Sequence, residues 1–225
     1  MQVIVTSCKR LKYLKRTIES LRQDDVQLIV VDDGSNDPEI ESYIRENADI
    51  PVLCTVNKGA DFSKNVGLAY VTDDIFMITS DDLVYPKGYS KLLEDQYRKI
   101  NEIELKYMFM ACNMYTVEAK LKHKWVKINN ISLFTVCKSQ VAGAILNTKI
   151  VRNMGGWPIY GTTGAGDRAL SHKLRCAGYL VGYFKNPMIE HIGNQKYTDY
   201  PEYSKEFRID QLRVRSDANQ NRFNK

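Results

Sequence analysis

The feature that most constrains the fold of this chain is an alternation, over its first hundred residues, of short apolar runs and amphipathic stretches. The runs are nearly free of polar residues and rich in β-branched ones, which is typical of strands buried on both faces. The stretches between them repeat apolar residues every three or four positions, which is typical of helices. The runs occupy 3–5, 28–31, 52–56 and 74–79. This order predicts an α/β fold with a Rossmann-like, mostly parallel sheet flanked by helices.

The second half of the chain follows a different pattern. Strand-like runs at 107–114, 133–137 and 141–146 come without regular helices between them, which predicts a mixed or antiparallel extension of the same sheet. A helix is expected from Asp167 to Ala177, closed by Gly178 and followed by a strand at 179–184. The length of 225 residues suits one domain with an elaborated second half.

Charge and cysteine content restrict the setting in which the chain works. The net charge of +5 permits a polyanionic partner but does not require one. Five scattered cysteines include no C-x-x-C pair, which argues against a zinc site and against a disulfide framework. The N-terminus has no signal-peptide pattern, and the longest nearly apolar stretch, 107–115, is too short to span a bilayer. We therefore expect a soluble, cytoplasmic protein with reduced thiols.

Polar clusters follow three of the predicted strands at the point where each strand ends. They are Thr6-Ser7, Asp32-Asp33 and Ser80-Asp81-Asp82. Because ligands bind beyond the carboxyl ends of parallel strands, we expect these clusters to share one site. Four crowded carboxylates repel one another unless a cation compensates them, and Mg²⁺ or Mn²⁺ with phosphate oxygens would do so. Asp-Gly-Ser after a strand is also ordinary turn chemistry, so a purely structural role for Asp32-Asp33 stays open.

These residues, in their order and spacing, resemble the family 2 glycosyltransferases of the GT-A fold. The resemblance covers roughly residues 2 to 195, and the first ninety carry most of it. Its segments are 5–7, 31–37, 57–59 with 64–67, 78–82, 164–167 and 190–191. It implies one GT-A domain over 1–225, with a donor-binding half (1–100), an acceptor-binding and catalytic half (101–200) and a C-terminal helix or tail (201–225).

The resemblance also implies roles in binding the donor. Thr6, Ser7 and one of Asp32 or Asp33 would contact the nucleoside, where a carboxylate accepts the N3–H of uracil or thymine and so selects a UDP- or dTDP-sugar. Lys58 or Lys64 would approach the diphosphate. Asp81 would hold the ribose or share the metal, and Asp82 would bind Mn²⁺ or Mg²⁺. His191 would be a further metal ligand or a diphosphate contact.

On the acceptor side, the resemblance implies that Asp167 is the general base of an inverting transfer to a hydroxyl group. Gly166 would lie beside it. Trp157, next to two glycines, would either stack on a sugar face or simply pack in the core. The sequence does not choose among a glycan, a glycoprotein and a modified DNA base as the acceptor.

Two departures from the family pattern bear on this interpretation. Thr79 stands where the family commonly has the first acid of an Asp-x-Asp-Asp motif, and Gly166 stands where an acid commonly precedes the base. They leave open a nucleotide-sugar-binding module without activity. A sugar-nucleotide nucleotidyltransferase is a further alternative, but the loop 6–10 lacks the glycines of a phosphate loop. No G-x-G-x-x-G follows the first strand, which disfavours a dinucleotide oxidoreductase.

Overall fold

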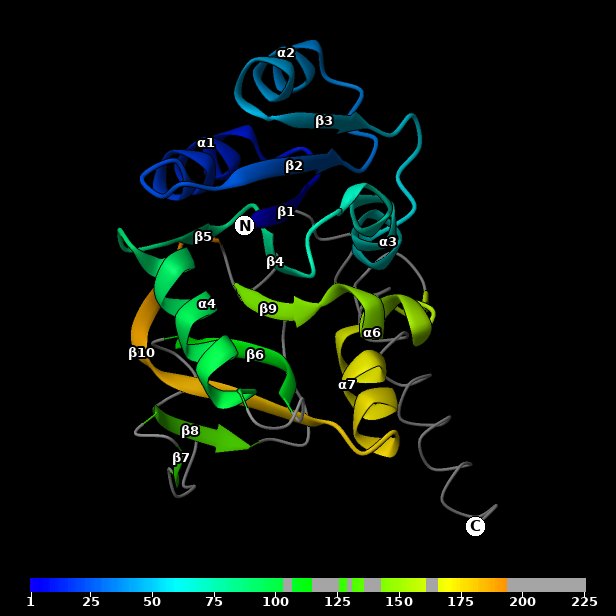
Figure 1. Ribbon diagram of the computed structural model, residues 1–225. Coiled ribbons are helices and arrows are strands. Elements are labelled where there is room, and N and C mark those ends of the chain that lie inside the picture. The colour runs from blue at the N-terminus through cyan, green and yellow to red at the C-terminus, as the bar shows by residue number, and fades with distance from the viewer. Residues whose placement is uncertain (103–106, 115–125, 129–130, 136–142, 161–165, 194–225) are drawn as a thin grey trace.

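The structure is a computed structural model in which residues 1–102, 107–114, 126–128, 131–135, 143–160 and 166–193 are described (Figure 1). The predicted C-terminal helix or tail at 201–225 lies outside these ranges. No helix within them is both long and apolar enough to cross a bilayer.

The first half alternates strands and helices as predicted. Asp37 caps the second helix by accepting a hydrogen bond from the Glu39 N–H at 2.9 Å, and Pro38 occupies its first turn, so this boundary follows from local sequence. The elements are β1 (Gln2–Ser7), α1 (Leu11–Leu21), β2 (Gln27–Asp32), α2 (Pro38–Asn47), β3 (Ile50–Leu53), α3 (Ala60–Tyr70) and β4 (Ile75–Ser80).

The second half contains mainly strands, with three further helices among the described residues. Its elements are β5 (Leu83–Val84), α4 (Tyr89–Ile100), β6 (Tyr107–Met114), β7 (Val126–Ile128), β8 (Ile131–Thr135), β9 (Ala144–Asn147), α6 (Thr148–Asn153), α7 (Gly166–Cys176) and β10 (Leu180–His191). The short helix α6 was not predicted, and Asn147 begins it by accepting a hydrogen bond from the Ile150 N–H at 3.0 Å. Strand β10 continues to His191, beyond the predicted end at 184.

The strands form one sheet in the order β3-β2-β1-β4-β9-β6-β10-β8-β7, and β5 pairs with the end of β10. Strands β1 to β4 are mutually parallel, whereas β9 runs antiparallel to both of its neighbours, β4 and β6. The predicted parallel sheet with a mixed extension is therefore confirmed. Strand β10 is parallel to β6 and antiparallel to β8, so a late segment lies inside the sheet rather than at its edge.

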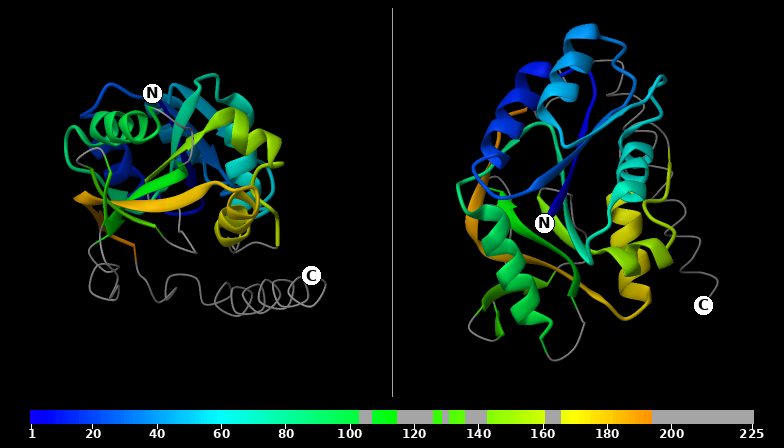
Figure 2. Two further views of the ribbon diagram at one scale, coloured as in Figure 1. Left: turned by 60° about the horizontal axis from the view of Figure 1, so that its bottom comes forward. Right: turned by 45° about the horizontal axis from the view of Figure 1, so that its top comes forward.

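Helices cover both faces of the sheet (Figures 1 and 2). Helices α1, α2 and α4 pack on one face against alternate strand residues such as Val3 and Leu28. Helices α3, α6 and α7 pack on the other face against the intervening residues, such as Ile4 and Ile29. This alternation follows from the two-residue period of a strand. It places α3, α6 and α7 on the same face (Figure 1), and the start of α7 contacts α3, which matters for the site below.

A carboxylate from the α1–β2 connection caps α4, whose own N-cap residue, Gly88, has no side chain. Asp24 accepts hydrogen bonds from the Gly88 N–H at 2.6 Å, the Ser90 N–H at 2.8 Å and the Ser90 hydroxyl at 2.6 Å. Burial acts to raise the pKa of Asp24, but these hydrogen bonds outweigh it and lower that pKa. The carboxylate therefore stabilises the fold above its unfolded-state pKa of about 4, and this contribution is lost as the pH falls through the lower folded-state pKa.

We expect Asp24→Ala to lower the free energy of unfolding at pH 7 by about 1–2 kcal/mol, the usual effect of losing a helix cap. Urea denaturation at pH 7 and near pH 3 measures it, and the difference from the unmodified chain is expected to shrink at the lower pH. The neighbouring, exposed Asp25 provides the control variant Asp25→Ala. Equal loss of stability in both variants would contradict a capping role for Asp24.

Candidate active site

The ends of β1, β2 and β4 bring the three polar clusters to one edge of the sheet, here called the strand-end edge. Ser7 pairs in register with Asp32, and Thr6 pairs with Ser80. Asp81 and Asp82 follow directly, and both are buried, with exposed fractions of 0% and 7%. The predicted convergence of the clusters at one edge is confirmed, because parallel strands in register end together.

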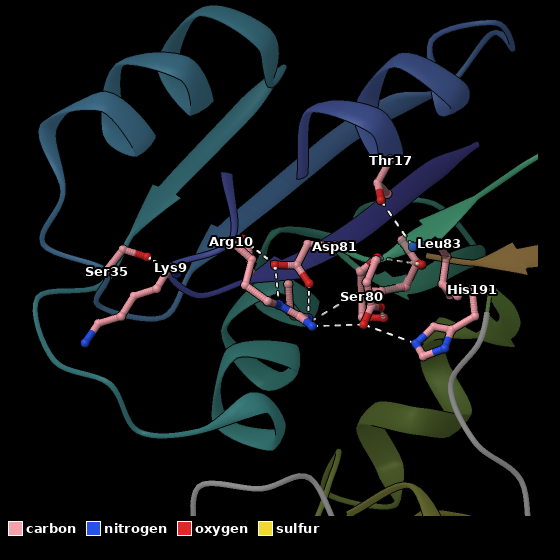
Figure 3. Close-up of polar contacts among 12 residues, drawn as sticks. Lys9, Arg10, Thr17, Ser35, Ser80, Asp81, Leu83 and His191 are labelled. Carbon is pink, nitrogen blue, oxygen red and sulfur yellow. Dashed lines mark hydrogen bonds and ion pairs between the residues drawn. The ribbon is translucent and has the colours of Figure 1, made fainter. Parts of the chain in front are cut away.

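An arginine that the sequence analysis did not single out lies between the two aspartates (Figure 3). Arg10 Nη1 donates to Asp82 Oδ2 at 2.9 Å, Arg10 Nε donates to Asp81 Oδ2 at 3.2 Å, and Arg10 Nη2 pairs with Asp81 Oδ1. The Ser7 hydroxyl also donates to Asp81 Oδ2, at 2.8 Å. The Arg10 guanidinium therefore neutralises part of the negative charge of these carboxylates. From the sequence, a metal ion was expected to neutralise all of it.

The loop after β1 directs Arg10 toward these carboxylates. Lys9 has a left-handed backbone with φ of 57°, and its N–H donates to the Ser35 hydroxyl at 2.7 Å. The turn ends at Arg10, the residue just before α1. A non-glycine residue in this conformation stores strain, and such strain is common where a loop positions a functional side chain.

The two aspartates differ in acidity. Burial holds the pKa of Asp81 above its ordinary value, although the Arg10 charge and the Ser7 hydrogen bond oppose that effect. Burial acts in the same sense on Asp82, but the His191 hydrogen bond and the Arg10 charge outweigh it, so the pKa of Asp82 lies below its ordinary value. Asp82 is therefore the more firmly anionic of the two.

Strand β10 brings His191 to the same carboxylate. His191 pairs with Leu83 of β5, and its Nε2 lies 3.2 Å from Asp82 Oδ2. The Ile192 N–H donates to the Asp82 carbonyl at 2.9 Å. A Cβ at Gly193 would stand 2.4 Å from Asp82 Oδ2 and 2.9 Å from its Cβ, so a side chain at 193 would displace the aspartate.

Asp82 Oδ2 and His191 Nε2, an oxygen and a nitrogen donor, converge at this edge of the sheet. This pair fits Mn²⁺, which accepts both donor types. His191 Nδ1 is buried and has no hydrogen-bond partner within the described part of the chain. Over that same part, no group of three or more His, Cys, Asp and Glu side chains is arranged to hold a metal ion.

Asp32 and Asp33 already accept hydrogen bonds from the protein. Asp32 accepts from the Ser35 N–H at 2.9 Å and from the Ser35 hydroxyl. These hydrogen bonds fit the structural role in a turn that was the alternative interpretation of this segment. Asp33 accepts from the backbone N–H groups of Lys58 at 3.0 Å and Gly59 at 2.7 Å, which ties the end of β2 to the start of α3. Both carboxylates are buried, and each thus has a structural role whatever else it binds.

Two lysines expected near the diphosphate have different surroundings. Lys58 is exposed, and its Nζ lies 4.8 Å from the centre of the Phe62 ring. Lys64 is buried, and its Nζ donates to Asp61 at 3.1 Å and to Asp167 at 2.7 Å. Of the two lysines, Lys58 has the more accessible ammonium, because that of Lys64 is buried and held by two carboxylates.

Trp157 is buried, with 1% exposure, and packs edge-on against Phe76 at 6.4 Å between ring centres. Of the two roles predicted for this ring, its burial and its contact with Phe76 support packing, and stacking on a sugar stays a prediction. Its indole N–H donates to Asp167 Oδ1 at 3.0 Å. Gly166 begins α7, and its N–H donates to Asp61 Oδ2 at 2.7 Å.

Three residues of this region escaped the sequence analysis: Arg10, Asp61 and Gly193. Arg10 follows β1 by three residues, so a basic side chain that close to a strand end could have been assigned to the strand-end edge. Asp61 reads as an ordinary acid in the first turn of a helix. Gly193 has no local sequence signal, since its closeness to Asp82 depends on the pairing of β10 with β5.

Comparison with known proteins gives a consistent picture. A family model described as glycosyl transferase family 2 matches residues 2–154. A mannosyltransferase from Pyrobaculum calidifontis, solved with GDP-Man and Mn²⁺, is similar with a TM-score of 0.63 and 18% identity, over 87% of this chain and 57% of that one. S. aureus TarS 1-349 with UDP-GlcNAc is similar with a TM-score of 0.60 and 16% identity, over 86% and 58%.

A third similar structure is GalNAc-T7 with UDP, GalNAc and Mn²⁺, with a TM-score of 0.64 and 11% identity, over 86% of this chain and 44% of that one. The chain thus spans between two fifths and three fifths of the length of these three proteins. A search of curated proteins found no match.

Proposed function

Because the chain belongs to glycosyl transferase family 2 and has the GT-A fold, we propose that it transfers a sugar from a nucleoside diphosphate to an acceptor hydroxyl, with inversion at the anomeric carbon. The donor is a UDP- or dTDP-sugar. The observation that carries the proposal is the arrangement at the strand-end edge. There the Asp82 carboxylate, which could bind a cation, lies between the basic side chains of Arg10 and His191.

In the proposed donor complex, the chain's own residues divide into two groups. Thr6, Ser7 and one of Asp32 or Asp33 would contact the nucleoside, and the exposed Lys58 would neutralise the diphosphate. Asp82 and His191 would hold Mn²⁺ or Mg²⁺. Asp81 accepts hydrogen bonds from Ser7 and Arg10, and its proposed role is to orient these two side chains rather than to bind the metal. When bound, the ion neutralises charge that develops on the leaving diphosphate.

Asp167 is the proposed general base. The acceptor oxygen forms a bond to the anomeric carbon while the bond from that carbon to the diphosphate oxygen breaks, and the hydroxyl proton passes to the Asp167 carboxylate. The electron pair of the broken bond leaves with the diphosphate. Attack from the face opposite the leaving group inverts the anomeric configuration. The Lys64 ammonium donates a hydrogen bond to the Asp167 carboxylate at 2.7 Å and helps to hold it in place.

The proposal is tested by a thermal-shift panel of UDP-, dTDP- and GDP-sugars, each with and without Mn²⁺, followed by assays of donor hydrolysis. A ligand that binds only the folded state raises the unfolding temperature by mass action. We expect UDP- or dTDP-sugars with Mn²⁺ to raise it most and to be hydrolysed slowly. Binding without hydrolysis or transfer would instead identify a nucleotide-sugar-binding module.

Arg10→Met is expected to tighten Mn²⁺ binding in the absence of donor. The guanidinium occupies the Asp82 oxygen that the ion needs, and a charge-assisted hydrogen bond contributes about 1.5–3 kcal/mol, so affinity should rise roughly tenfold or more. Titration of Mn²⁺ followed by calorimetry or electron paramagnetic resonance measures the change. Arg98→Met, which removes an exposed ion pair with Asp74, is the control. Weaker Mn²⁺ binding by Arg10→Met would show that Arg10 supports the metal site rather than competing with the ion.

A further inference from the structure

A buried cluster of three charged side chains joins α3 to the start of α7. Lys64 Nζ lies 3.1 Å from Asp61 Oδ1 and 2.7 Å from Asp167 Oδ1. Asp61 and Lys64 are three residues apart on α3, so their side chains share one face of that helix. Asp61 is fully buried, and Lys64 is 6% exposed. The lysine is thus a bridge between two carboxylates that are far apart in sequence.

Asp61 also holds the first residue of α7. Its Oδ2 accepts the Gly166 N–H at 2.7 Å. A Cβ on Gly166 would lie 2.5–2.7 Å from the three carboxyl atoms of Asp61, closer than real Cβ contacts. The Asp61 carboxylate therefore fills the space that a side chain at 166 would need. Asp61 is thus a second acidic group near Asp167, and it is supplied by α3. The family commonly has that acid at the position just before the base, where this chain has Gly166.

Stability alone is a weak explanation for this cluster. Removing two carboxylates and an ammonium from water is costly, and well-packed apolar residues in place of a buried ion pair are often neutral or stabilising. Burial acts to raise the pKa of Asp61 and to lower that of Lys64, yet the two carboxylates raise the pKa of Lys64 above its ordinary value. The ammonium is therefore kept charged at the point where it donates to Asp167.

We propose that Asp61 and Lys64 are positioning residues for Asp167, an inference that rests on the proposed function. The Lys64 ammonium and the Trp157 indole N–H both donate to Asp167 Oδ1, which fixes the orientation of the carboxylate. Asp61 in turn holds the ammonium and the backbone at Gly166. The positive charge of Lys64 and the negative charge of Asp61 act on Asp167 in opposite directions. Together they set how strongly Asp167 attracts the proton of the acceptor hydroxyl.

This arrangement makes the pH dependence respond in opposite directions to two substitutions. In Lys64→Met, Asp167 loses its cation and keeps Asp61 as a neighbour, so the acid limb of the activity profile should move to higher pH. In Asp61→Asn, the Lys64 charge acts on Asp167 uncompensated, so that limb should move to lower pH. Among the described residues, Lys64 of α3 pairs with Asp167, Asp61 lies on the far side of that lysine, and Trp157 adds a neutral donor. Residues 161–165 contain no ionisable side chain.

The experiment measures kcat against pH for the full chain with saturating donor, Mn²⁺ and acceptor, or with water as the acceptor. The acid limb of this profile reports the base in the enzyme–substrate complex. We expect it to move up by about one pH unit in Lys64→Met and down by a similar amount in Asp61→Asn. Lys91→Met and Asp95→Asn, which break an exposed ion pair on α4, are the matched controls and should leave it in place.

A relocation variant covers the case in which Lys64→Met fails to fold. Asp61→Ala empties the space beside Gly166, and the double variant Asp61→Ala/Gly166→Asp returns a carboxylate to that space from α7. We expect the double variant to recover part of the activity that Asp61→Ala loses. Gly166→Asp alone, which forces two carboxylates together, should be worse than either.

The outcomes separate this inference from the proposed function. An unmodified chain that neither binds nor hydrolyses any donor would overturn the proposed function before any variant is made. An active chain in which Lys64→Met and Asp61→Asn fold, bind donor and keep the parent acid limb would overturn the positioning role alone. So would failure of relocation in a folded double variant.

Discussion

Asp82→Ala is expected to lower turnover by at least about 100-fold while the chain keeps its fold, since removing one group that stabilises developing charge commonly costs 10²–10³ in kcat. Asp82 is buried, meets His191 and Arg10, and is the more firmly anionic of the two adjacent aspartates. Arg10 remains paired with Asp81 in this variant, so no buried cation is left without a partner.

The measurements are donor hydrolysis, sugar transfer and the unfolding temperature with and without Mn²⁺. We expect Asp82→Ala to lose the stabilisation that Mn²⁺ and donor give together, because this variant lacks the carboxylate oxygens proposed to bind the ion. Asp95→Ala, at an exposed site on α4, provides a carboxylate control that should match the parent chain. Full activity in Asp82→Ala would refute its role at the centre of the donor site.

Asp167→Asn is expected to reduce kcat by about 10²–10⁴-fold and to leave donor affinity unchanged, as loss of a general base does. The amide keeps the size of the carboxylate and its carbonyl oxygen can still accept from Trp157 and Lys64, so the start of α7 should be preserved. What it loses is the capacity to take a proton. Donor binding by calorimetry and single-turnover transfer separate the two effects.

The stereochemistry of the product gives an independent check. NMR of the newly formed linkage should show the anomeric configuration opposite to that of the donor sugar. Retention would exclude Asp167 as the base of a single displacement, and so would an Asp167→Asn variant with the kcat of the parent chain. Ser171→Ala on the same helix, whose hydroxyl donates to the Asp167 carbonyl at 2.7 Å, controls for disturbance of α7.

Much of the first half of the fold was predictable because its signals are local. The β-branched runs at 3–5 and 28–31 have no polar face, so they had to lie inside a covered sheet. Asp37 and Pro38 mark the start of α2 without reference to any distant residue. Parallel strands in register end at one edge, which brought Ser7, Asp32 and Ser80 together as expected.

The second half was harder to predict because its pairings join distant segments. Nothing in the run at 179–184 indicates that β10 lies between β6 and β8, or that it continues to pair with β5. That continuation is what delivers His191 and Gly193 to Asp82. Each strand carries only its own two-residue period, and the choice of neighbour depends on how the whole sheet assembles.

Residue type and spacing encode local structure, so the fold class, the family and the three polar clusters at the strand ends could be predicted from the sequence. Which charges meet depends instead on how the helices and strands pack. Arg10 lies between Asp81 and Asp82. Lys64 forms buried ion pairs with Asp61 and Asp167 and does not occupy an exposed position near a diphosphate. The physical reason is burial: a charge removed from water must find a partner within a few ångströms, and helix packing decides which partner is there.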